Sequence, residues 1–151
     1  PFNTFGPRQS LRALIPTIVT QALNNKYIKV GNLYPSRDFT FVEDTANAFY
    51  EVLKCNTIFG KVVNVGTGKE HNVKEIIKLV NNILNVDKKI IHEKKRKRVK
   101  DSEVNRLLCC NKLIKKNTKW KPKNSFTNGL KKTIEWFSVR KNKYPSNIYN
   151  I

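Results

Sequence analysis

The sequence predicts an α/β fold, because short strand-like runs alternate with amphipathic stretches along a chain of 151 residues. That length is typical of one domain. Apolar spacing favours helices at residues 16–23, 43–55, 73–84, 102–117 and 125–139. Strand patterns lie at residues 27–30, 38–42, 61–65 and 89–91. The β-branched run KVVNV at 61–65 is typical of a strand buried on both faces, so we place it at the centre of a sheet.

Proline and glycine set the limits of the first elements. Gly6-Pro7 ends a short extended opening segment, because proline pushes the residue before it out of the helical region. Pro16 suits the first turn of a helix, so the first helix is expected to start there. The strand at 27–30 then ends at Gly31.

Capping residues mark the next two helices. Glu43, Asp44 and Thr45 offer acceptors to the free N–H groups at a helix start. The apolar face of this helix is expected to consist of Ala46, Phe49, Tyr50 and Leu53. Asn72 can cap the helix over 73–84, whose core positions are Val73, Ile76, Ile77, Val80, Ile83 and Leu84.

The C-terminal elements are predicted from turn residues and apolar spacing. After the helix over 102–117, Trp120-Lys121-Pro122 is expected to form a turn. Ser125 can begin the last helix, which aligns on one face the residues Phe126, Leu130, Ile134 and Phe137.

The net charge of +19 is distributed unevenly. Residues 1–87 carry 10 Lys and Arg against 7 Asp and Glu, whereas residues 88–151 carry 20 against 4. The excess indicates either an anionic partner or a lysine-rich proteome. The basic run at 94–100 has three interpretations: a solvated loop, an anion site or a nucleic-acid patch. It lacks the interleaved aromatic residues of a protein that binds single-stranded nucleic acid.

Composition excludes several classes of protein. Three cysteines without a CxxC pair, together with two histidines, argue against a zinc site or a disulfide framework, so reduced thiols are expected. If Cys109 and Cys110 share a helix, at most one of them can be buried. No apolar stretch is long enough to cross a membrane and no signal pattern opens the chain, so a cytoplasmic location is expected.

Motifs that would carry catalysis are also missing from the sequence. It has no GxGxxG or GxxGxxG loop after a strand, no GxxxxGK[ST], no serine nucleophile elbow, no HExxH and no Tyr followed four residues later by Lys in a helix. We therefore assign no catalytic residue and no metal ligand to this chain.

Arginines are the strongest binding candidates, because a planar guanidinium can grip phosphate through two parallel hydrogen bonds. Five of them stand apart from the lysine background: Arg8, Arg12, Arg37, Arg96 and Arg98. Arg37, next to a predicted strand, is either a ligand contact or a structural partner of Asp38 or Glu43. Asn3 needs hydrogen-bond partners, which a neighbouring loop or a ligand could supply.

Several segments together resemble one family. PFNTFGPRQ, LIPTIVTQAL, SRDFTFVEDTANAF, VVNVGTG and the closing GLKKTIEWF are similar to extended short-chain dehydrogenases that act on nucleotide sugars, the NAD-dependent epimerase/dehydratase family. Within it, the chain looks most like the 4,6-dehydratases of UDP- or GDP-N-acetylglucosamine in the legionaminic acid pathway. The match covers essentially the whole chain.

The resemblance implies a division of labour. An N-terminal Rossmann half, missing here, would carry the NAD loop and the catalytic groups, and residues 1–151 would be the nucleotide-sugar-binding C-terminal portion, with no second domain. The strand at 61–65 would join the missing sheet. The full-length enzyme would be a homodimer with a nucleotide-sugar substrate, and neither a membrane nor nucleic acid is expected as a partner. The implied substrate-binding residues are Asn3, Arg12, Val30, Asn32, Arg37 and Arg98.

Each of these residues has an implied role. Asn3 would bond the sugar diphosphate, and Arg12 would lie in the segment that leads into the nucleotide pocket. Val30 and Asn32 would lie near the nucleobase. Arg37 and Arg98 would both grip the diphosphate.

Departures from the family pattern leave alternatives open. Val99, Cys110 and Lys119 stand where the family usually has Pro, Asp and Gly. The implied reaction is 4,6-dehydration to a 4-keto-6-deoxy sugar, with the fragment inactive alone. A 4-epimerase or decarboxylase of the same family, or a stand-alone basic module for polyanions, remains as an alternative.

Overall fold

The computed structural model describes residues 1–96 and 104–144. The helices are α1 (Leu14–Asn24), α2 (Val42–Leu53), α3 (Val73–Leu84), α4 (Lys112–Asn117) and α5 (Phe126–Ser138). The strands are β1 (Thr4–Phe5), β2 (Tyr27–Val30), β3 (Ser36–Asp38), β4 (Thr40–Phe41), β5 (Glu70–Asn72), β6 (Lys89–His92) and β7 (Arg106–Leu107). Short 3-10 turns lie at η1 (Asn56–Ile58), η2 (Lys94–Arg96) and η4 (Lys141–Lys143).

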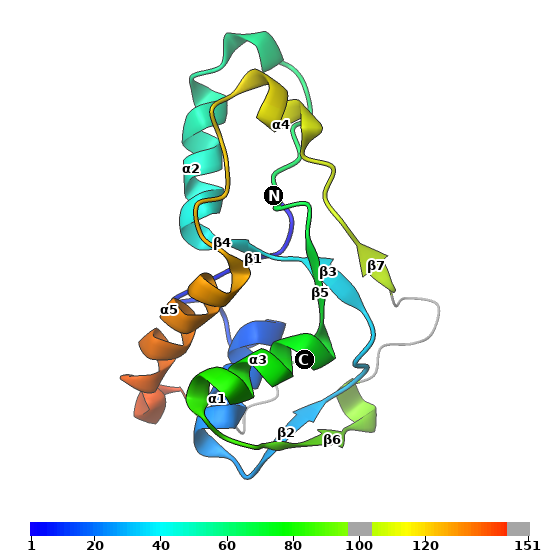
Figure 1. Ribbon diagram of the computed structural model, residues 1–151, viewed down its shortest axis with the longest axis vertical. Helices are drawn as coiled ribbons and strands as arrows, with labels where there is room; N and C mark the ends of the chain where they lie inside the picture. The colour runs from blue at the N-terminus through cyan, green and yellow to red at the C-terminus, as the bar shows by residue number, and fades with distance from the viewer. Residues whose placement is uncertain (97–103, 145–151) are drawn as a thin grey trace.

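The described strands form three small sheets, which confirms the α/β class. β1 pairs with β4 and β2 with β6, both in parallel, while β3 lies between antiparallel β5 and parallel β7. The chain is elongated, with α1, α3, α5 and the β2–β6 pair at one end and α2 and α4 at the other (Figure 1). Within the described residues, none of the helices has both the length and the apolar character needed to cross a membrane.

The main core lies between α1, α3 and α5. Asn72 caps α3 as expected and forms a capping box with Glu75, and Ser125 caps α5 by accepting a bond from the N–H of Asn128. Gly129 of α5 permits a close approach to β1 and β4, since a Cβ there would lie 2.7 Å from the Phe41 ring. The buried apolar residues of this core include Phe5, Ile18, Val19, Ile76, Ile77, Leu130 and Phe137.

A second, smaller core joins α2 to α4. It contains Ala48, Val65, Ile114 and Trp120. The Trp120 indole donates to the backbone oxygen of Asp44 at 2.9 Å. The Asp44 carboxylate accepts from the backbone N–H groups of Lys123 and Asn124, so the start of α2 is tied to the segment before α5.

The strand expected at 61–65 would join a sheet formed outside this chain, and that pairing stays a prediction. No strand is formed at 61–65 in the described chain; Val62 is 89% exposed, and the Val65 oxygen accepts one bond from the N–H of Phe2. A buried strand needs neighbours on both sides, and no described strand lies beside these residues.

The helix expected over 102–117 forms only at its end, over Lys112–Asn117. Residues 102 and 103 lie outside the described residues, and from 104 onward the chain forms strand β7 and then only the short helix α4. The expected turn at 120–122 is an irregular stretch with Trp120 buried in it.

The apolar face predicted for α2 is exposed. Ala46, Phe49, Tyr50 and Leu53 are all exposed, and α2 buries Asp44, Thr45 and Ala48 in their place.

Candidate functional site

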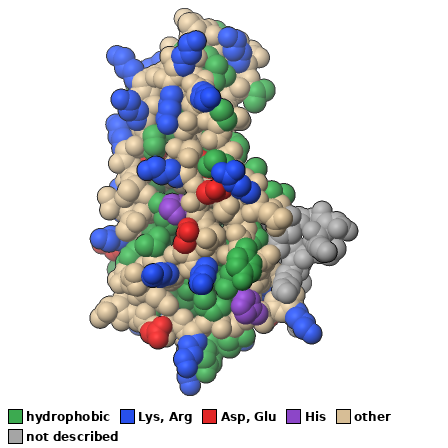
Figure 2. Space-filling model, turned by 45° about the vertical axis from the view of Figure 1, so that its right-hand side comes forward, with side chains coloured by type: hydrophobic (Ala, Val, Ile, Leu, Met, Phe, Trp, Pro, Cys, Tyr) green, Lys and Arg blue, Asp and Glu red, His purple; other side chains and the backbone are tan. Residues whose placement is uncertain are grey.

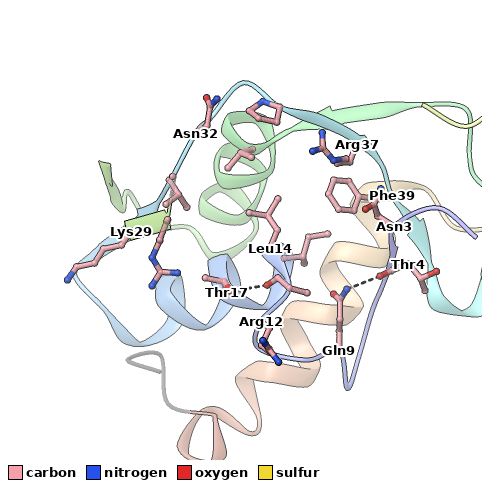
Figure 3. A pocket seen from close by; sticks show the side chains of 17 residues that line it. Asn3, Thr4, Gln9, Arg12, Leu14, Thr17, Lys29, Asn32, Arg37 and Phe39 are labelled. Atoms are coloured by element: carbon pink, nitrogen blue, oxygen red, sulfur yellow. Dashed lines mark hydrogen bonds between the residues drawn. The ribbon is translucent and has the colours of Figure 1, made fainter. Parts of the chain in front are cut away.

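A cavity of about 440 Å³ opens between the start of α1, strand β2 and the chain leading into β3. Five of the six residues predicted to bind substrate line it: Asn3, Arg12, Val30, Asn32 and Arg37. Figure 3 shows Asn32 above, Arg37 on the β3 side and Arg12 below, so these side chains come from different parts of the chain. The sixth, Arg98, lies outside the described residues.

Backbone bonds fix the Asn3 side of the cavity. The Asn3 side-chain amide donates to the backbone oxygen of Asp38 at 3.1 Å, and the backbone oxygen of Asn3 accepts from the N–H of Thr40 at 3.0 Å. Next to it, the Gln9 amide donates to the Thr4 oxygen at 2.8 Å (Figure 3). The opening segment is therefore tied to β3 and β4 and holds polar groups at the cavity wall.

Gln21 fixes the opposite wall by clamping β2 to α1. Its side-chain amide donates to the Lys29 oxygen at 3.1 Å, and its oxygen accepts from the N–H of Lys29 at 2.9 Å. Gln21 is almost fully buried, so these bonds are shielded from water. They set the position of Val30 and Gly31, which line the cavity.

Arg37 lies on β3, in register with His71 of β5 and Leu107 of β7. Its Nη1 donates to the oxygen of Ser36 at 2.8 Å. The structural alternatives for this arginine, Asp38 and Glu43, have other partners. The Glu43 carboxylate contacts Lys132 at 2.9 Å.

The buried Asp38 carboxylate binds the glycine-rich turn of the VGTG segment. It accepts from the N–H and hydroxyl of Thr67 at 2.9 and 2.7 Å and from the N–H of Gly68 at 2.7 Å. Gly66 packs against Cys109, where a Cβ would lie 2.3 Å from the cysteine Cβ. The donors of this turn are used within the protein, so the turn does not fit a dinucleotide phosphate.

Several cationic side chains line the cavity. Its lining includes Arg12, Lys29, Arg37 and Arg96 and, among the described residues, no Asp or Glu. Neutral polar groups come from Asn3, Thr4, Gln9, Thr17 and Asn32. This combination favours an anion with hydroxyl or amide groups attached, such as a phosphate ester.

Sequence reasoning missed several lining residues. Gln9, Thr17 and Lys29 had no signal of their own, because they are polar residues of a common kind. Arg96 was singled out but received no role, although it follows a predicted strand by only a few residues.

Titratable groups beside the cavity belong to a structural network. Burial lowers the pKa of His71, whose ring stacks on Phe126 at 4.1 Å. Hydrogen bonds from Arg106 and then Ser36 lower the pKa of Glu70. In the described part of the chain, no three His, Cys, Asp or Glu side chains gather as a metal site would require.

Comparison with solved structures places the fold among extended epimerase/dehydratase enzymes. The chain is similar to dTDP-glucose 4,6-dehydratase from Bacillus anthracis, solved with NAD, at 27% identity and a TM-score of 0.82 over 93% of this chain and 44% of that one. It is similar to UDP-glucose 4-epimerase of Thermotoga maritima, solved with UDP-glucose, at 26% identity and a TM-score of 0.81 over 95% of this chain and 45% of that one.

Sequence comparison gives the family itself. The profile of the family described as GDP-mannose 4,6 dehydratase matches residues 1–133, and the chain belongs to that family. It is 30% identical over 148 residues to an Escherichia coli dTDP-glucose 4,6-dehydratase, which covers 93% of this chain and 40% of that enzyme. The chain thus spans about 40% of the length of this curated relative.

Proposed function

We propose that this chain binds the nucleotide-sugar substrate of an NAD-dependent 4,6-dehydratase and acts together with a further part of that enzyme. The observation that carries the proposal is the convergence of Asn3, Arg12, Val30, Asn32 and Arg37 on one cationic cavity. A diphosphate carries the negative charge that this lining favours, and the polar residues beside it suit the nucleoside and the sugar.

Under this proposal residues 1–151 are the C-terminal, substrate-binding portion, and NAD is bound by an N-terminal Rossmann half. Two observations support this division. The sequence has no dinucleotide loop, and the Gly66–Gly68 turn is bonded to Asp38. NAD would accept a hydride from the sugar and return it, so the residues of this chain would hold the substrate in place and would not catalyse the reaction alone.

The identity of the substrate belongs to the same proposal. The resemblance to N-acetylglucosamine-nucleotide dehydratases of the legionaminic acid pathway stays a prediction. The curated relative above is named for dTDP-glucose, and the matching family is named for GDP-mannose. A 4-epimerase or a decarboxylase remains the alternative, because groups outside this chain would decide the reaction. A homodimer of the complete enzyme is likewise proposed.

Calorimetric titration with nucleotide sugars tests the proposal. The chain should bind at least one of UDP-glucose, dTDP-glucose and GDP-mannose, should bind NAD at least about ten-fold more weakly, and should lose about ten-fold or more of its affinity in Arg37→Ala. Lys131→Gln is the control, because this exposed residue of α5 lies outside the cavity. Equal affinity of the wild type and Arg37→Ala would contradict the role of Arg37.

A basic surface gives a second candidate function, the binding of polyanions. Six exposed lysines lie between residues 112 and 123, and Figure 2 shows Lys and Arg side chains gathered over the end of the molecule that carries α2 and α4. Polyanion binding should weaken steeply with salt and ignore the base, whereas the cavity should distinguish nucleotides at constant salt. Titration of a poly-U oligonucleotide at 50 and 200 mM salt separates the two functions.

A further inference from the structure

Two buried residues hold the walls of the cavity, and neither is among the described residues that line it. Asp38 lies on β3 next to Arg37, and its backbone oxygen accepts the bond from the Asn3 amide. Gln21 lies on α1 and clamps Lys29 of β2. Asp38 is 0% exposed and Gln21 is 1% exposed, so both side chains lie behind the cavity wall.

The Asp38 carboxylate and the Arg37 side chain leave β3 on opposite faces, because successive side chains of a strand alternate. The carboxylate accepts from the N–H and hydroxyl of Thr67 and from the N–H of Gly68. A longer bond of 3.4 Å comes from the N–H of Cys109. An ionised carboxylate has about four acceptor sites, so these donors use its capacity. Asp38 thus ties β3 to the VGTG turn and to the stretch before α4.

The VGTG turn is itself held by further contacts. The Asn111 amide donates to the Gly66 oxygen at 2.7 Å, and this bond is buried. The Val65 oxygen accepts from the N–H of Phe2 at 2.8 Å, and Val65 belongs to the smaller core. Because Phe2 directly precedes Asn3, the turn braces the opening segment as well as β3.

The opposite wall of the cavity has a different support. β2 pairs with β6, whereas β3 lies in another sheet, between β5 and β7. Gln21 bonds both the N–H and the oxygen of Lys29, and the Val30 oxygen accepts from the N–H of Glu93 at 2.9 Å. None of these bonds passes through Asp38 or the VGTG turn. The two walls are therefore held by two distinct sets of bonds.

We propose that Asp38 and Gln21 are positioning residues for different parts of the substrate, Asp38 for the diphosphate and Gln21 for the nucleobase. This inference rests on the proposed function and on the roles that the resemblance implies for Asn3, Arg37 and Val30. The VGTG turn then serves the substrate site as a brace, although it is not among the described residues that line the cavity.

Competition calorimetry with two kinds of ligand tests these roles. The relative affinities of UDP, dTDP and GDP report on the nucleobase, and inorganic pyrophosphate, which displaces them, reports on the diphosphate alone. Asp38→Asn should weaken pyrophosphate binding about five-fold and leave the preference among the three bases unchanged. Gln21→Met should leave pyrophosphate binding unchanged and alter that preference about three-fold.

Neither charge nor a general loss of stability produces this pattern. Removing the Asp38 carboxylate takes away negative charge near an anion site, which should tighten pyrophosphate binding if only net charge matters. A general loss of stability should change both readouts in both variants. Tighter or unchanged pyrophosphate binding in Asp38→Asn would overturn the role of Asp38, and an unchanged base preference in Gln21→Met would overturn that of Gln21.

Milder variants decide the question if near-ultraviolet circular dichroism shows that either substitution prevents folding. Thr67→Val removes the hydroxyl bond to Asp38 and keeps the backbone bond, so pyrophosphate binding should weaken about two-fold. Gln21→Glu keeps the acceptor for the N–H of Lys29 and loses the donor to its oxygen, so the base preference should change as in Gln21→Met. Wild-type behaviour of a milder variant would overturn the corresponding role. Lys131→Gln is the control and should leave both readouts unchanged.

Two further outcomes separate this inference from the proposed function. If Arg37→Ala weakens binding while Asp38→Asn and Gln21→Met each change both readouts, the nucleotide-sugar site stands and the separate roles of Asp38 and Gln21 are overturned. A wild-type chain that binds none of the three diphosphates would overturn the proposed function itself and this inference with it.

Discussion

Helices α2 and α3 have the same length of 12 residues, yet they use their apolar side chains in opposite ways. α3 directs them into the main core, where it buries Val73, Ile76, Ile77 and Val80. α2 instead leaves three large apolar residues more than half exposed: Phe49, Tyr50 and Leu53. Spacing along the sequence shows that a helix has an apolar face, but the burial of that face depends on a surface elsewhere in the chain.

The neighbourhood of α2 continues this difference. Phe59 and Val62, which follow it in the chain, are 70% and 89% exposed, and the segment 61–65 has no strand beside it. The chain spans about 40% of a curated relative that it matches along most of its own length. Under the proposed function, the rest of the enzyme covers this face.

The largest expected effect is a loss of stability that only α3 should show. Ile76 is fully buried, so Ile76→Ala should lower the free energy of unfolding by about 3 kcal/mol, because it removes apolar contacts and leaves a cavity. Leu53→Ala, at a 75% exposed position, should change it by less than about 0.5 kcal/mol. Urea denaturation followed by tryptophan fluorescence measures both. Similar losses in the two variants would show that α2 packs against more of the chain than the structure describes.

Self-association should distinguish the two helices next. An exposed apolar patch favours association, although the net charge of +19 opposes it until salt screens the repulsion. The chain should therefore associate at 0.5 M salt, a concentration that gives a Debye length of about 4 Å. Phe49→Lys combined with Leu53→Lys should abolish this association without loss of stability.

Light scattering during size exclusion provides that measurement. Val139→Lys is the matched control, because Val139 is 73% exposed at the end of α5, and it should leave the association unchanged. Unaltered association in the double variant would assign the contact to another surface.

Sequence reasoning predicted those parts of the fold that depend on residues close together in the sequence. Asn72 and Ser125 cap their helices as expected, and Leu130, Ile134 and Phe137 are buried on one face of α5. It failed where structure depends on distant or missing surfaces. Val62–Val65 has the pattern of a central strand but no strand beside it, and residues 104–111 have apolar spacing but form an edge strand, β7, and an irregular stretch.

The candidate site was predicted in a similar way. Resemblance identified Asn3 and Arg37, which lie in quoted segments, and Arg12, which lies between two of them, and the structure places all three on one cavity. Arg96 could not be assigned from its position in a run of basic residues. Its place at the cavity depends on the pairing of β6 with β2, which only the structure shows.

The two adjacent cysteines provide the smallest and most local comparison, and they lie outside any helix, just before α4. Cys109 is buried and Cys110 exposed, although the helix from which this difference was expected does not form there. Burial is the main cause that raises the pKa of the Cys109 thiol to about 11, and the charge of the nearby Asp38 is the second. Because the thiolate is the form that reacts with iodoacetamide, Cys110 should be alkylated well before Cys109 at pH 8.

The pH dependence of Cys109 has a definite sign. The pKa of Cys109 in the folded protein lies above the ordinary value of 9.0. The contribution of this thiol to the free energy of unfolding is therefore complete below pH 9 and is lost as the pH rises toward 11. Mass spectrometry of timed iodoacetamide reactions should show labelling of Cys109 increasing over that interval. Gly66→Ala should speed it at pH 8, because the added Cβ displaces the thiol that packs against Gly66. Equal labelling of both cysteines in the native protein at pH 8 would mean that the VGTG turn does not shield Cys109 in solution.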